Sequence, residues 1–390
     1  MLSTLLEKIN VEHLVSGCVS SIICKRFGPI AYMELFLTDD CNLCCDYCFV
    51  KNKRPFSMSK DIAFKSLDLF CRSSGKLKDL GILFFGGEPL LEYNLIKEIV
   101  LYAKEKEKEY NKNISFDMTT NGTLINEEML KFFYHNKIKF LLSIDGNEED
   151  HNRHRKTKNG VGSFDMVYSK ISLFKRYQPW LGSRYTVYPD NVQNLERNVK
   201  YLFFSNINQF IIGPAHGIDW SMERINIFHE QLIMLFNFYI ECRKEKRPLR
   251  LTIFEHGSLK EETNRYKNAW GCGAGRGRIC LSTSGDIYGC SKLMSIMGVD
   301  KGILKMGNVF DGFNNANNRL LLNDNSDRYR LKCRSCDLSD RCTGGCPALN
   351  YSTFGNIYEP DPTECAFRRV YEEVGIYSRK QLEELNMISY

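Results

Sequence analysis

Three closely spaced cysteines mark the stretch of the chain that carries the most specific chemistry. Cys41, Cys45 and Cys48 follow a C-x3-C-x2-C spacing, and an aromatic residue, Tyr47, directly precedes the last of them. Three thiolates in one loop can hold three irons of a cubane iron–sulfur cluster, whereas a fully protein-ligated cluster takes four. The fourth iron is then left for a small molecule, and an open metal position is typical of a reactive site.

Two other interpretations fit this loop on spacing alone. Cys41 and Cys44 could form half of a zinc knuckle, because Cys44 is adjacent to Cys45 and makes the register ambiguous. Cysteine is also often buried as a small hydrophobic side chain. The spacing by itself leaves all three interpretations open.

A second sequence downstream favours the cluster. Residues 84–89 read F-F-G-G-E-P. With the cysteine spacing and Tyr47, this stretch resembles the radical S-adenosylmethionine (SAM) superfamily, whose signature is C-x3-C-x2-C followed by a G-G-E-P-like strand end. The resemblance implies that SAM chelates the open iron through its amino and carboxylate groups. Its reductive cleavage would give methionine and a 5′-deoxyadenosyl radical, which abstracts hydrogen from a substrate.

The composition indicates a globular chain that is large enough for more than one domain. The chain has 390 residues, and its contents of 43% hydrophobic and 26% charged residues are ordinary. A net charge of +6 permits an acidic peptide partner, but no dense Lys/Arg stripe interleaved with aromatic residues indicates nucleic-acid binding. No apolar run reaches the length of a membrane span. We therefore expect no nucleic acid and no membrane among the partners.

The 16 cysteines are expected to be metal ligands and not disulfides. Dense disulfides are typical of small secreted domains, whereas this chain is large. Residues 1–10 carry Glu7 and Lys8 where a signal peptide would be apolar. We therefore expect a reducing, cytoplasmic location in which these thiols bind metal.

Strand and helix patterns alternate through residues 31–215. The predicted strands are 32–38, 81–85, 115–119, 140–144, 184–187 and 210–212. The predicted helices between them are 60–71, 95–109, 126–134, 164–177 and 195–204. Six such units predict an α/β fold with a parallel sheet, arranged as a partial (β/α)6, TIM-like barrel. The SAM resemblance implies the same barrel.

Glycine-rich and polar sequences follow the predicted strands, at the carboxyl ends where parallel barrels carry their chemistry. The cysteine loop follows the first strand, Gly86 and Gly87 follow the second, residues 119–123 (T-T-N-G-T) the third, and Ser143 with Asp145 the fourth. A lone Asn-Gly or Asp-Gly is most often only a turn. Several such sequences at successive strand ends predict one shared site.

The resemblance to radical SAM enzymes implies roles for these strand-end residues. Gly86, Gly87 and Glu88 would bind the amino group of SAM. Ser143 and Arg155 would hold its carboxylate, with Arg155 contributing its charge and fork geometry. Other residues implied in cofactor binding are Tyr47, Asn121, Asp145 and Arg184.

Two of these assignments carry a qualification in the sequence itself. Related maturases read S-x-D-G-P-x3-H-D-x2-R where this chain has Asn147 for the proline and Asn152 for the aspartate. The geometry of the loop before Arg155 therefore departs from the family pattern. Arg184 has a structural alternative, which is to close an ion pair inside the barrel.

A second field of cysteines lies in the C-terminal part of the chain. Its spacing is C-x12-G-x4-C from Cys272 to Cys290, then C-x2-C-x5-C-x3-C from Cys333 to Cys346, and finally Cys365. Structural zinc sites also use C-x2-C pieces, which is the alternative interpretation. The spacing, the turn glycine and the order together resemble the SPASM domain, the C-terminal extension of many peptide-modifying radical SAM enzymes.

The SPASM resemblance implies two auxiliary 4Fe–4S clusters, three clusters in all with the one that binds SAM. Cys272, Cys290 and Cys346 would hold the near cluster. The far cluster would be held by Cys333, Cys336, Cys342 and Cys365. We add the hypothesis that Cys280 completes the near cluster, because residues 284–285 (Ser-Gly) would fold its strand back toward Cys290 as a hairpin.

The sequence is expected to divide into four parts. These are an N-terminal segment (1–30), the radical SAM partial barrel (31–215), a bridging helix and linker (216–268), and the SPASM auxiliary-cluster domain (269–390). The bridge is predicted to hold a helix at 222–243 and a strand at 249–254. The first segment is too short for the leader-binding winged-helix domain of many relatives. A separate leader-binding protein, or a leaderless substrate, is therefore expected.

The predicted function is that of a radical SAM peptide maturase. The resemblance implies hydrogen abstraction from a ribosomally made peptide, followed by oxidative cross-linking through a thioether or a carbon–carbon bond. A flavodoxin- or ferredoxin-type protein would donate the electron. No general base stands out in the sequence, and Asp145, Glu88 and Tyr288 are the candidates.

Three alternatives remain open at this point. An anaerobic sulfatase maturase would form formylglycine, but that group typically has an aspartate after the last cysteine of the glycine-containing pair. Here Ser291 and Lys292 follow Cys290. Radical modification of a small molecule is a second alternative. A non-catalytic, zinc-stabilised binding protein is the third, and it leaves the strand-end residues unexplained.

Overall fold

Strands and helices alternate along the first half of the chain as the sequence predicts. The computed structural model describes residues 28–51, 53–255, 270–296, 304–325 and 330–387, so most of the expected N-terminal segment and part of the bridge lie outside it. The strands of this half are β1 (Tyr32–Phe36), β2 (Asp79–Phe85), β3 (Asn113–Thr120), β4 (Lys139–Leu142), β5 (Gly182–Val187) and β6 (Gln209–Pro214). Its helices are α3 (Lys60–Ser73), α4 (Tyr93–Tyr110), α5 (Glu127–His135), α6 (Glu148–His154), α7 (Phe164–Tyr168), α8 (Ile171–Tyr177) and α9 (Leu195–Phe204).

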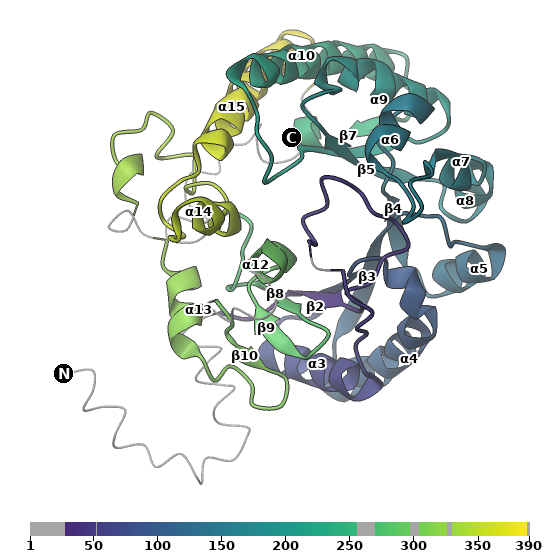
Figure 1. Cartoon of the computed structure of the whole chain (residues 1–390), viewed down its shortest axis with the longest axis vertical. Helices are drawn as coiled ribbons and strands as arrows, with labels where there is room; N and C mark the ends of the chain where they lie inside the picture. Colours follow the sequence, from purple (N-terminus) through teal and green to yellow (C-terminus); the bar gives the residue numbers. More distant parts are fainter. Residues whose placement is uncertain (1–27, 52, 256–269, 297–303, 326–329, 388–390) are drawn as a thin grey trace.

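The strands form one sheet that curves into an open arc. β1 to β6 pair with one another in parallel and in sequence order. Two further parallel strands extend this arc, with β7 (Arg250–Leu251) beside β6 and β8 (Arg278–Leu281) beside β1. Figure 1 shows helices α3, α4, α5, α8 and α9 on the outer side of the arc. The predicted α/β partial barrel is confirmed, with parallel strands added at both ends.

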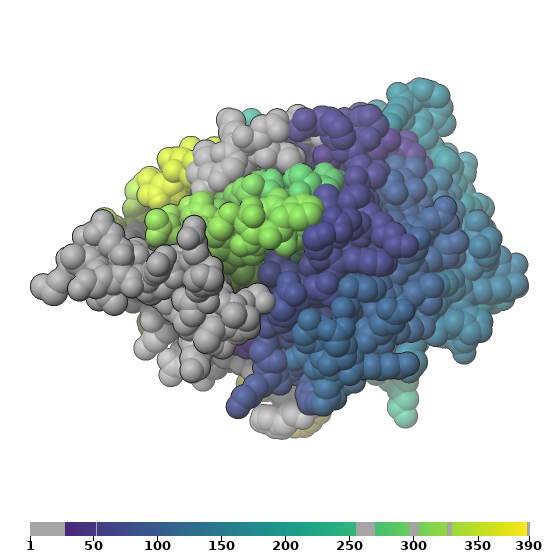
Figure 2. Space-filling model, turned by 90° about the horizontal axis from the view of Figure 1, so that it is seen from below, coloured from purple at the N-terminus to yellow at the C-terminus, as the bar shows by residue number. Residues whose placement is uncertain are grey.

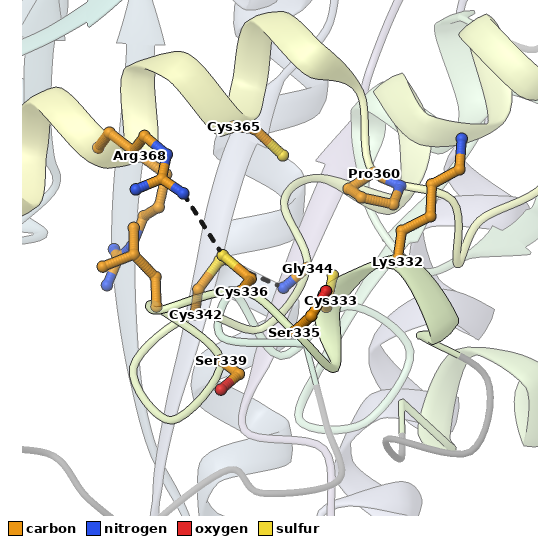
Figure 3. A pocket seen from close by; sticks show the side chains of 12 residues that line it. Lys332, Cys333, Ser335, Cys336, Ser339, Cys342, Gly344, Pro360, Cys365 and Arg368 are labelled. Atoms are coloured by element: carbon orange, nitrogen blue, oxygen red, sulfur yellow. Dashed lines mark hydrogen bonds between the residues drawn. The ribbon is translucent and has the colours of Figure 1, made fainter.

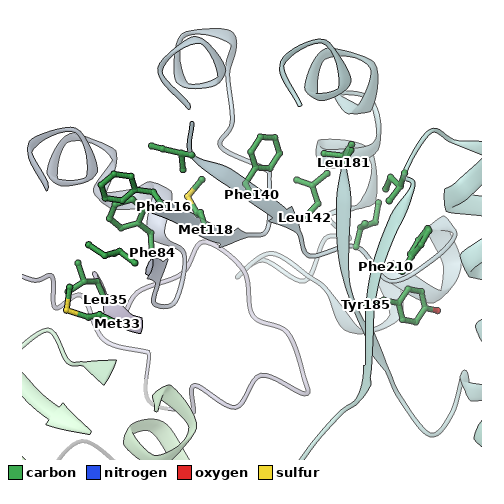
Figure 4. Close-up of a cluster of buried hydrophobic side chains, with 14 of the residues drawn as sticks. Met33, Leu35, Phe84, Phe116, Met118, Phe140, Leu142, Leu181, Tyr185 and Phe210 are labelled. Atoms are coloured by element: carbon green, nitrogen blue, oxygen red, sulfur yellow. The ribbon is translucent and has the colours of Figure 1, made fainter. Parts of the chain in front are cut away.

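The core lies between the strands and the outer helices. Alternate residues of each strand are buried against those helices, as Figure 4 shows for Met33, Leu35, Phe84, Phe116, Met118, Phe140, Leu142, Leu181, Tyr185 and Phe210. Burying a large apolar side chain contributes roughly 1.5–3 kcal/mol, so this layer fixes the register of the sheet. The residues in between, such as Glu34, Asp117 and Arg184, face the inner side of the arc.

Most predicted elements shift by a few residues at their ends, and two differ more than that from the structure. The helix predicted at 164–177 is broken into α7 and α8, because Ser169 Oγ donates to the Asp165 carbonyl and Lys170 Nζ donates to the carbonyls of Thr123 and Ile125. The strand predicted at 249–254 is only two residues long. Thr252 Oγ1 donates to the Phe210 carbonyl at 3.2 Å, and the chain turns into the short helix α11 (Thr252–Glu255).

The C-terminal half adds a hairpin to the barrel sheet and a group of helices beside it. Its strands are β8, β9 (Asp286–Tyr288) and β10 (Gly307–Asn308), and β9 pairs antiparallel with both neighbours. Its helices are α12 (Ser291–Ile296), α13 (Ala316–Asn323), α14 (Pro347–Phe354) and α15 (Pro362–Glu384), and α15 packs along α10 (Met222–Lys244). None of the helices in the described part of the chain combines the length and apolar character needed to cross a membrane.

The hairpin also contacts the outer helices of the barrel. Gly285, at a φ of +81°, forms its turn close to Ile62 of α3, and Lys65 of α3 lies 5.1 Å from the centre of the Phe310 ring. Figure 2 shows the green surface of the segment around α13 directly beside the purple surface of the first barrel units. The hairpin that carries Cys280 is therefore part of the barrel sheet and also packs against its first helix.

Candidate active site and cysteine clusters

The first cysteine loop is anchored on the end of β2. Backbone N–H groups of Gly87 and Glu88 donate to the carbonyls of Thr38 and Asp40, at 2.8 and 2.9 Å. A Cβ atom on Gly87 would lie 2.0 Å from the Asp40 carbonyl oxygen, and Gly86 has a φ of +148°. The two glycines are needed because the backbone of β2 touches the backbone of the loop.

The other side of the loop is held by the segment after α6. The N–H of Cys44 donates to the Lys156 carbonyl at 2.7 Å, and that of Asp46 to the His154 carbonyl at 3.2 Å. A turn joins Cys45 and Cys48, since the Cys48 N–H donates to the Cys45 carbonyl at 3.2 Å. The loop is thus fixed between the end of β2 and the segment after α6, which is the preorganisation that a cluster site needs.

Hydrogen-bond donors surround the sulfur of Cys41. The Leu43 N–H approaches this sulfur at 3.4 Å, and Asn121 Nδ2 approaches it at 3.8 Å. Asn121 Nδ2 also donates to Asn42 Oδ1 at 2.8 Å. Burial raises the pKa of Cys41 to about 11, so a bound metal would have to displace the proton. N–H groups aimed at sulfur stabilise a cluster thiolate, so this loop fits the predicted iron–sulfur site.

Glu88 connects the carboxyl ends of β2 and β3. Its carboxylate accepts hydrogen bonds from Thr120 Oγ1 (2.7 Å), the Asn121 N–H (2.8 Å) and the Leu90 N–H (3.1 Å). The residue is 1% exposed, and burial raises its pKa from 4.5 to about 7. A carboxylate has about four acceptor positions, so three are already filled by the protein. The contact of Glu88 with the amino group of SAM stays a prediction.

A buried ion pair lies at the end of β4. Arg155 donates to both oxygens of Asp145, from Nε at 2.6 Å and from Nη2 at 3.1 Å. The Tyr47 hydroxyl and the Thr186 N–H also donate to this carboxylate. Burial alone would raise the pKa of Asp145, but the Arg155 charge outweighs it and the pKa is lowered. Asp145 is therefore an ionised structural partner of Arg155, and this does not favour it as a general base.

Arg184 is a second guanidinium near this site, and it faces the inner side of the barrel. Its Nη1 donates to the Ile211 carbonyl at 3.1 Å, and Gly213 leaves room for it to lie across β6. No carboxylate forms an ion pair with Arg184 among the residues that the structure describes, so the alternative of an interior ion pair is not seen there. Burial lowers its pKa. A half-buried guanidinium without a carboxylate partner is suited to bind an anion. Ser143 follows the neighbouring strand β4 and is also half-buried, so its hydroxyl could contact the same anion.

The four cysteines assigned to the far cluster line one cavity of about 250 Å³. Figure 3 shows this cavity between the loop that carries Cys333, Cys336 and Cys342 and the helix α15, from which Cys365 reaches in. The other side chains around it include Lys332, Arg368 and Arg369. The structure thus brings together residues that are up to 32 positions apart, from Cys333 to Cys365, as the difference between residue numbers 365 and 333 gives.

The cysteines assigned to the near cluster gather beside the β8–β9 hairpin. The pKa of Cys290 is raised by burial, by Glu34 and by the nearby thiols of Cys272 and Cys346. Cys280 lies on β8, and its pKa is raised by burial, by Glu34 and by Cys290. The predicted hairpin is confirmed, and it turns the chain back from Cys280 toward Cys290. The role of Cys280 as a ligand stays a prediction.

Tyr288 lies inside a small apolar cluster. It is 2% exposed and packs with Phe36, Val50, Cys280 and Met294, while Cys48 packs against the same cluster. This cluster joins the first cysteine loop to the second cysteine field. A buried position among apolar side chains does not favour Tyr288 as a general base.

The cavity at the four far cysteines has room for more than a single metal ion. Its volume is about 250 Å³, and Cys333, Cys336, Cys342 and Cys365 line it. In a cubane each thiolate binds a different iron, so the sulfurs lie apart around a larger core. The cavity is therefore compatible with a cluster, and the auxiliary cluster at these cysteines stays a prediction.

Comparison with known proteins places the barrel in a family. The pattern of the radical SAM superfamily matches residues 35–202. An uncharacterised protein of Methanocaldococcus jannaschii, MJ0907, is 30% identical over 260 residues, which are 65% of this chain and 89% of that protein. The chain belongs to the radical SAM superfamily. It is therefore an enzyme whose chemistry uses SAM and a 4Fe–4S cluster.

Other relatives of this radical SAM enzyme match most of its length. The cysteine-type anaerobic sulfatase-maturating enzyme of Clostridium perfringens is 25% identical over 343 residues, 82% of this chain and 89% of the relative. The solved structure of native anSMEcpe with bound AdoMet has a TM-score of 0.74 at 21% identity and covers 92% of this chain and 99% of that one. SuiB of Streptococcus suis, solved with its precursor peptide SuiA, has a TM-score of 0.61 at 16% identity, covering 93% and 86%. These structures show the same fold.

The structure adds a residue pair to this radical SAM site that the sequence analysis does not single out. His216 follows the end of β6, and its Nδ1 lies 2.9 Å from Glu364 Oε1 on α15. Burial lowers the pKa of His216, and the charges of Lys292 and Arg184 lower it further. The pair thus connects the barrel to the helix that carries Cys365. Its position after a strand end is the one signal that the sequence offers.

Proposed function

We propose that this radical SAM enzyme oxidises a side chain of a ribosomally made peptide and thereby forms a cross-link, either a thioether or a carbon–carbon bond. The observation that carries the proposal is the assembly of a second cysteine field beside the barrel, with four cysteines around one cavity. Two auxiliary clusters at these positions would accept electrons, so the product would be oxidised relative to the substrate. The relatives named as sulfatase-maturating enzymes and the SuiB complex with its precursor peptide support a peptide or protein substrate.

Residues at the strand ends have separate roles in this proposal. Cys41, Cys45 and Cys48 would hold the cluster that binds SAM, which supplies the 5′-deoxyadenosyl radical when it is cleaved. Arg184 and Ser143 would bind the carboxylate of SAM, because the charge of Arg155 is already matched by Asp145. Gly86 and Gly87 would offer backbone to the amino group, while Tyr47, Asn121 and Glu88 position the loop around it.

Cys280 is proposed as the fourth ligand of the near auxiliary cluster, with Cys272, Cys290 and Cys346. It is buried on the hairpin strand, and the nearby thiol of Cys290 adds to the burial and to Glu34 in raising its pKa. A Cys280→Ala variant should lose iron or change the spectrum of one auxiliary cluster only. Full iron and an unchanged spectrum would instead leave that cluster open to a substrate thiolate.

Formylglycine formation is the second candidate, because relatives with that printed activity align over most of the chain. The position after Cys290 argues against it. Ser291 stands where an aspartate base is expected, and its N–H donates to Glu34 Oε2 at 2.8 Å as α12 begins. A flavodoxin- or ferredoxin-type donor and a leader-binding partner are proposed for either activity.

The test is co-expression with short peptides encoded beside the gene, with the Cys41/Cys45/Cys48→Ala triple variant as the matched control. A cross-linked product would be lighter by two hydrogens, would lack reactivity toward aldehyde probes and would be absent from the control. An aldehyde-reactive product would favour formylglycine formation. Peptides that never change mass would overturn the maturase proposal and favour a small-molecule substrate.

A further inference from the structure

The two sets of C-terminal cysteines lie in different electrostatic surroundings. In the far set, Arg369 Nη2 lies 3.8 Å from the sulfur of Cys336, and the Gly344 N–H lies 3.4 Å from the sulfur of Cys342. Three of these four cysteines are half-buried and Cys365 is exposed, so solvent also reaches this site. Positive charge, hydrogen bonds to sulfur and solvent all stabilise the more negative, reduced form of a cluster.

Arg369 is held at this sulfur by two features of the fold. It follows Cys365 by four residues on α15, so both side chains project from the same face of the helix. Asp337, next to Cys336 in sequence, accepts from Arg369 Nη2 at 2.7 Å and from Nη1 at 3.0 Å. The guanidinium is therefore oriented by a two-point contact and presents Nη2 to Cys336.

Carboxylates lie near both sets. In the far set, Asp337 Oδ1 lies 3.6 Å from the sulfur of Cys336, beside the guanidinium that it binds. In the near set, Glu34 on β1 is directly opposite Cys280 on β8 and accepts from the N–H of Ser291, while Arg278 lies 3.6 Å from Glu34. Exposure is also similar, because Cys280 is buried, Cys290 and Cys346 are half-buried and Cys272 is exposed. The contrast that remains is the guanidinium of Arg369, which approaches a ligand sulfur of the far set directly.

We propose that Arg369 tunes the far auxiliary cluster by raising its reduction potential. This inference rests on the proposed auxiliary clusters and adds a residue that sets the potential of one of them. Arg369 is a positioning and tuning residue, because it touches a ligand and not the substrate.

The experiment is a redox titration of the anaerobic holoenzyme, followed by electron paramagnetic resonance, with iron content measured on every sample. Arg369→Met keeps the aliphatic stem and removes the donor and charge, so the midpoint of one auxiliary cluster should fall while the others stay. Asp337→Asn removes a negative charge beside the same sulfur, so that midpoint should rise. A residue with only a structural role would not shift the potential in opposite directions in these two variants.

Arg368→Met is the matched control, because Arg368 also lines the cavity but bonds to the Arg341 carbonyl at 2.8 Å. We expect a smaller shift than for Arg369→Met. Equal shifts in the two arginine variants, or an unchanged midpoint at full iron content, would overturn the role of Arg369. A different result would show that the underlying cluster proposal is wrong. In that case, a variant with all four far cysteines replaced by alanine would contain as much iron as the wild type.

Discussion

Buried charge at the carboxyl end of the sheet is concentrated in the pair that Arg155 makes with Asp145. Both side chains are less than a tenth exposed, and the carboxylate also receives the Tyr47 hydroxyl and the Thr186 N–H. Such a network is costly to break, because removal of one partner leaves the other charge buried and unpaired. Tyr47 comes from the cysteine loop, so the network also holds that loop against β4 and β5.

Asp145→Asn should therefore destabilise the protein strongly. We expect a loss of about 3–5 kcal/mol in the free energy of unfolding, because Arg155 would keep its charge without a carboxylate. Asp190→Asn is the control, since Asp190 is 43% exposed in its contacts with His154 and Arg153 and should cost less than about 1 kcal/mol. Denaturant unfolding under anaerobic conditions measures both. Equal losses in the two variants would contradict a structural role for the buried pair.

Glu88 gives the site a pH dependence of a definite sign. Because burial raises its pKa from 4.5 to about 7, the native protein binds this proton more tightly than the unfolded chain does. Its contribution to stability is full below pH 4.5 and is lost as the pH rises through about 7. The free energy of unfolding of the wild type, minus that of Glu88→Gln, should thus decrease as the pH rises from 4.5 to about 7. Below and above this range the difference should stay constant. Unfolding measured at a series of pH values checks this, and a difference that rises with pH would refute it.

At this scale the sequence could name the residues but not their partners. The departures at Asn147 and Asn152 have simple physical reasons, since Asn147 caps α6 through the Asp150 N–H and Asn152 accepts from the Phe164 N–H at the start of α7. The sequence could not show that the charge of Arg155 is matched within the protein. Asp145 and Arg155 are 10 positions apart, and contacts over such separations depend on how the loops pack. The spacing of residues in the sequence does not predict this packing.

At the scale of elements, the cysteine loop is positioned by the strand that follows it. The periodicity of the sequence predicts β1 to β6 because their outward residues are consistently apolar, and the helices between them likewise. Where polar side chains capture backbone groups, as Ser169 and Thr252 do, the periodicity alone predicts elements that are too long. The glycines after β2 were recognisable in sequence. Their direct contact with the loop backbone was not, because it needs the register between β1 and β2.

Gly87→Ala tests this contact. A Cβ there would lie 2.0 Å from the backbone oxygen of Asp40, so the loop must shift, and we expect the variant to lose most of the iron of the first cluster, about four per chain. The auxiliary clusters should keep theirs. Gly277→Ala is the control, because a Cβ at Gly277 meets no atom within 4 Å. Iron analysis of both proteins decides the matter, and full iron in Gly87→Ala would mean that the loop does not depend on the end of β2.

At the scale of the whole molecule, one sheet connects the two cysteine fields. The sequence predicts a boundary near residue 269, and the cysteine spacing alone indicates a separate C-terminal unit. In the structure, β8 pairs in parallel with β1, so the hairpin that carries Cys280 continues the barrel sheet. Pairing between strands that are more than 240 residues apart leaves no pattern in a single sequence. The Phe36, Val50 and Tyr288 side chains complete this connection beside Cys48.

The most direct test of the account is the iron and zinc content of the anaerobically purified protein, beside the Cys41/Cys45/Cys48→Ala triple variant. Three cubanes predict roughly 12 irons per chain, and the variant should fall to about 8 because it lacks only the cluster that binds SAM. That result would support one SAM-binding cluster and two auxiliary clusters at the assigned cysteines. Zinc in place of iron, or a variant that keeps all its iron, would contradict the proposed cluster sites.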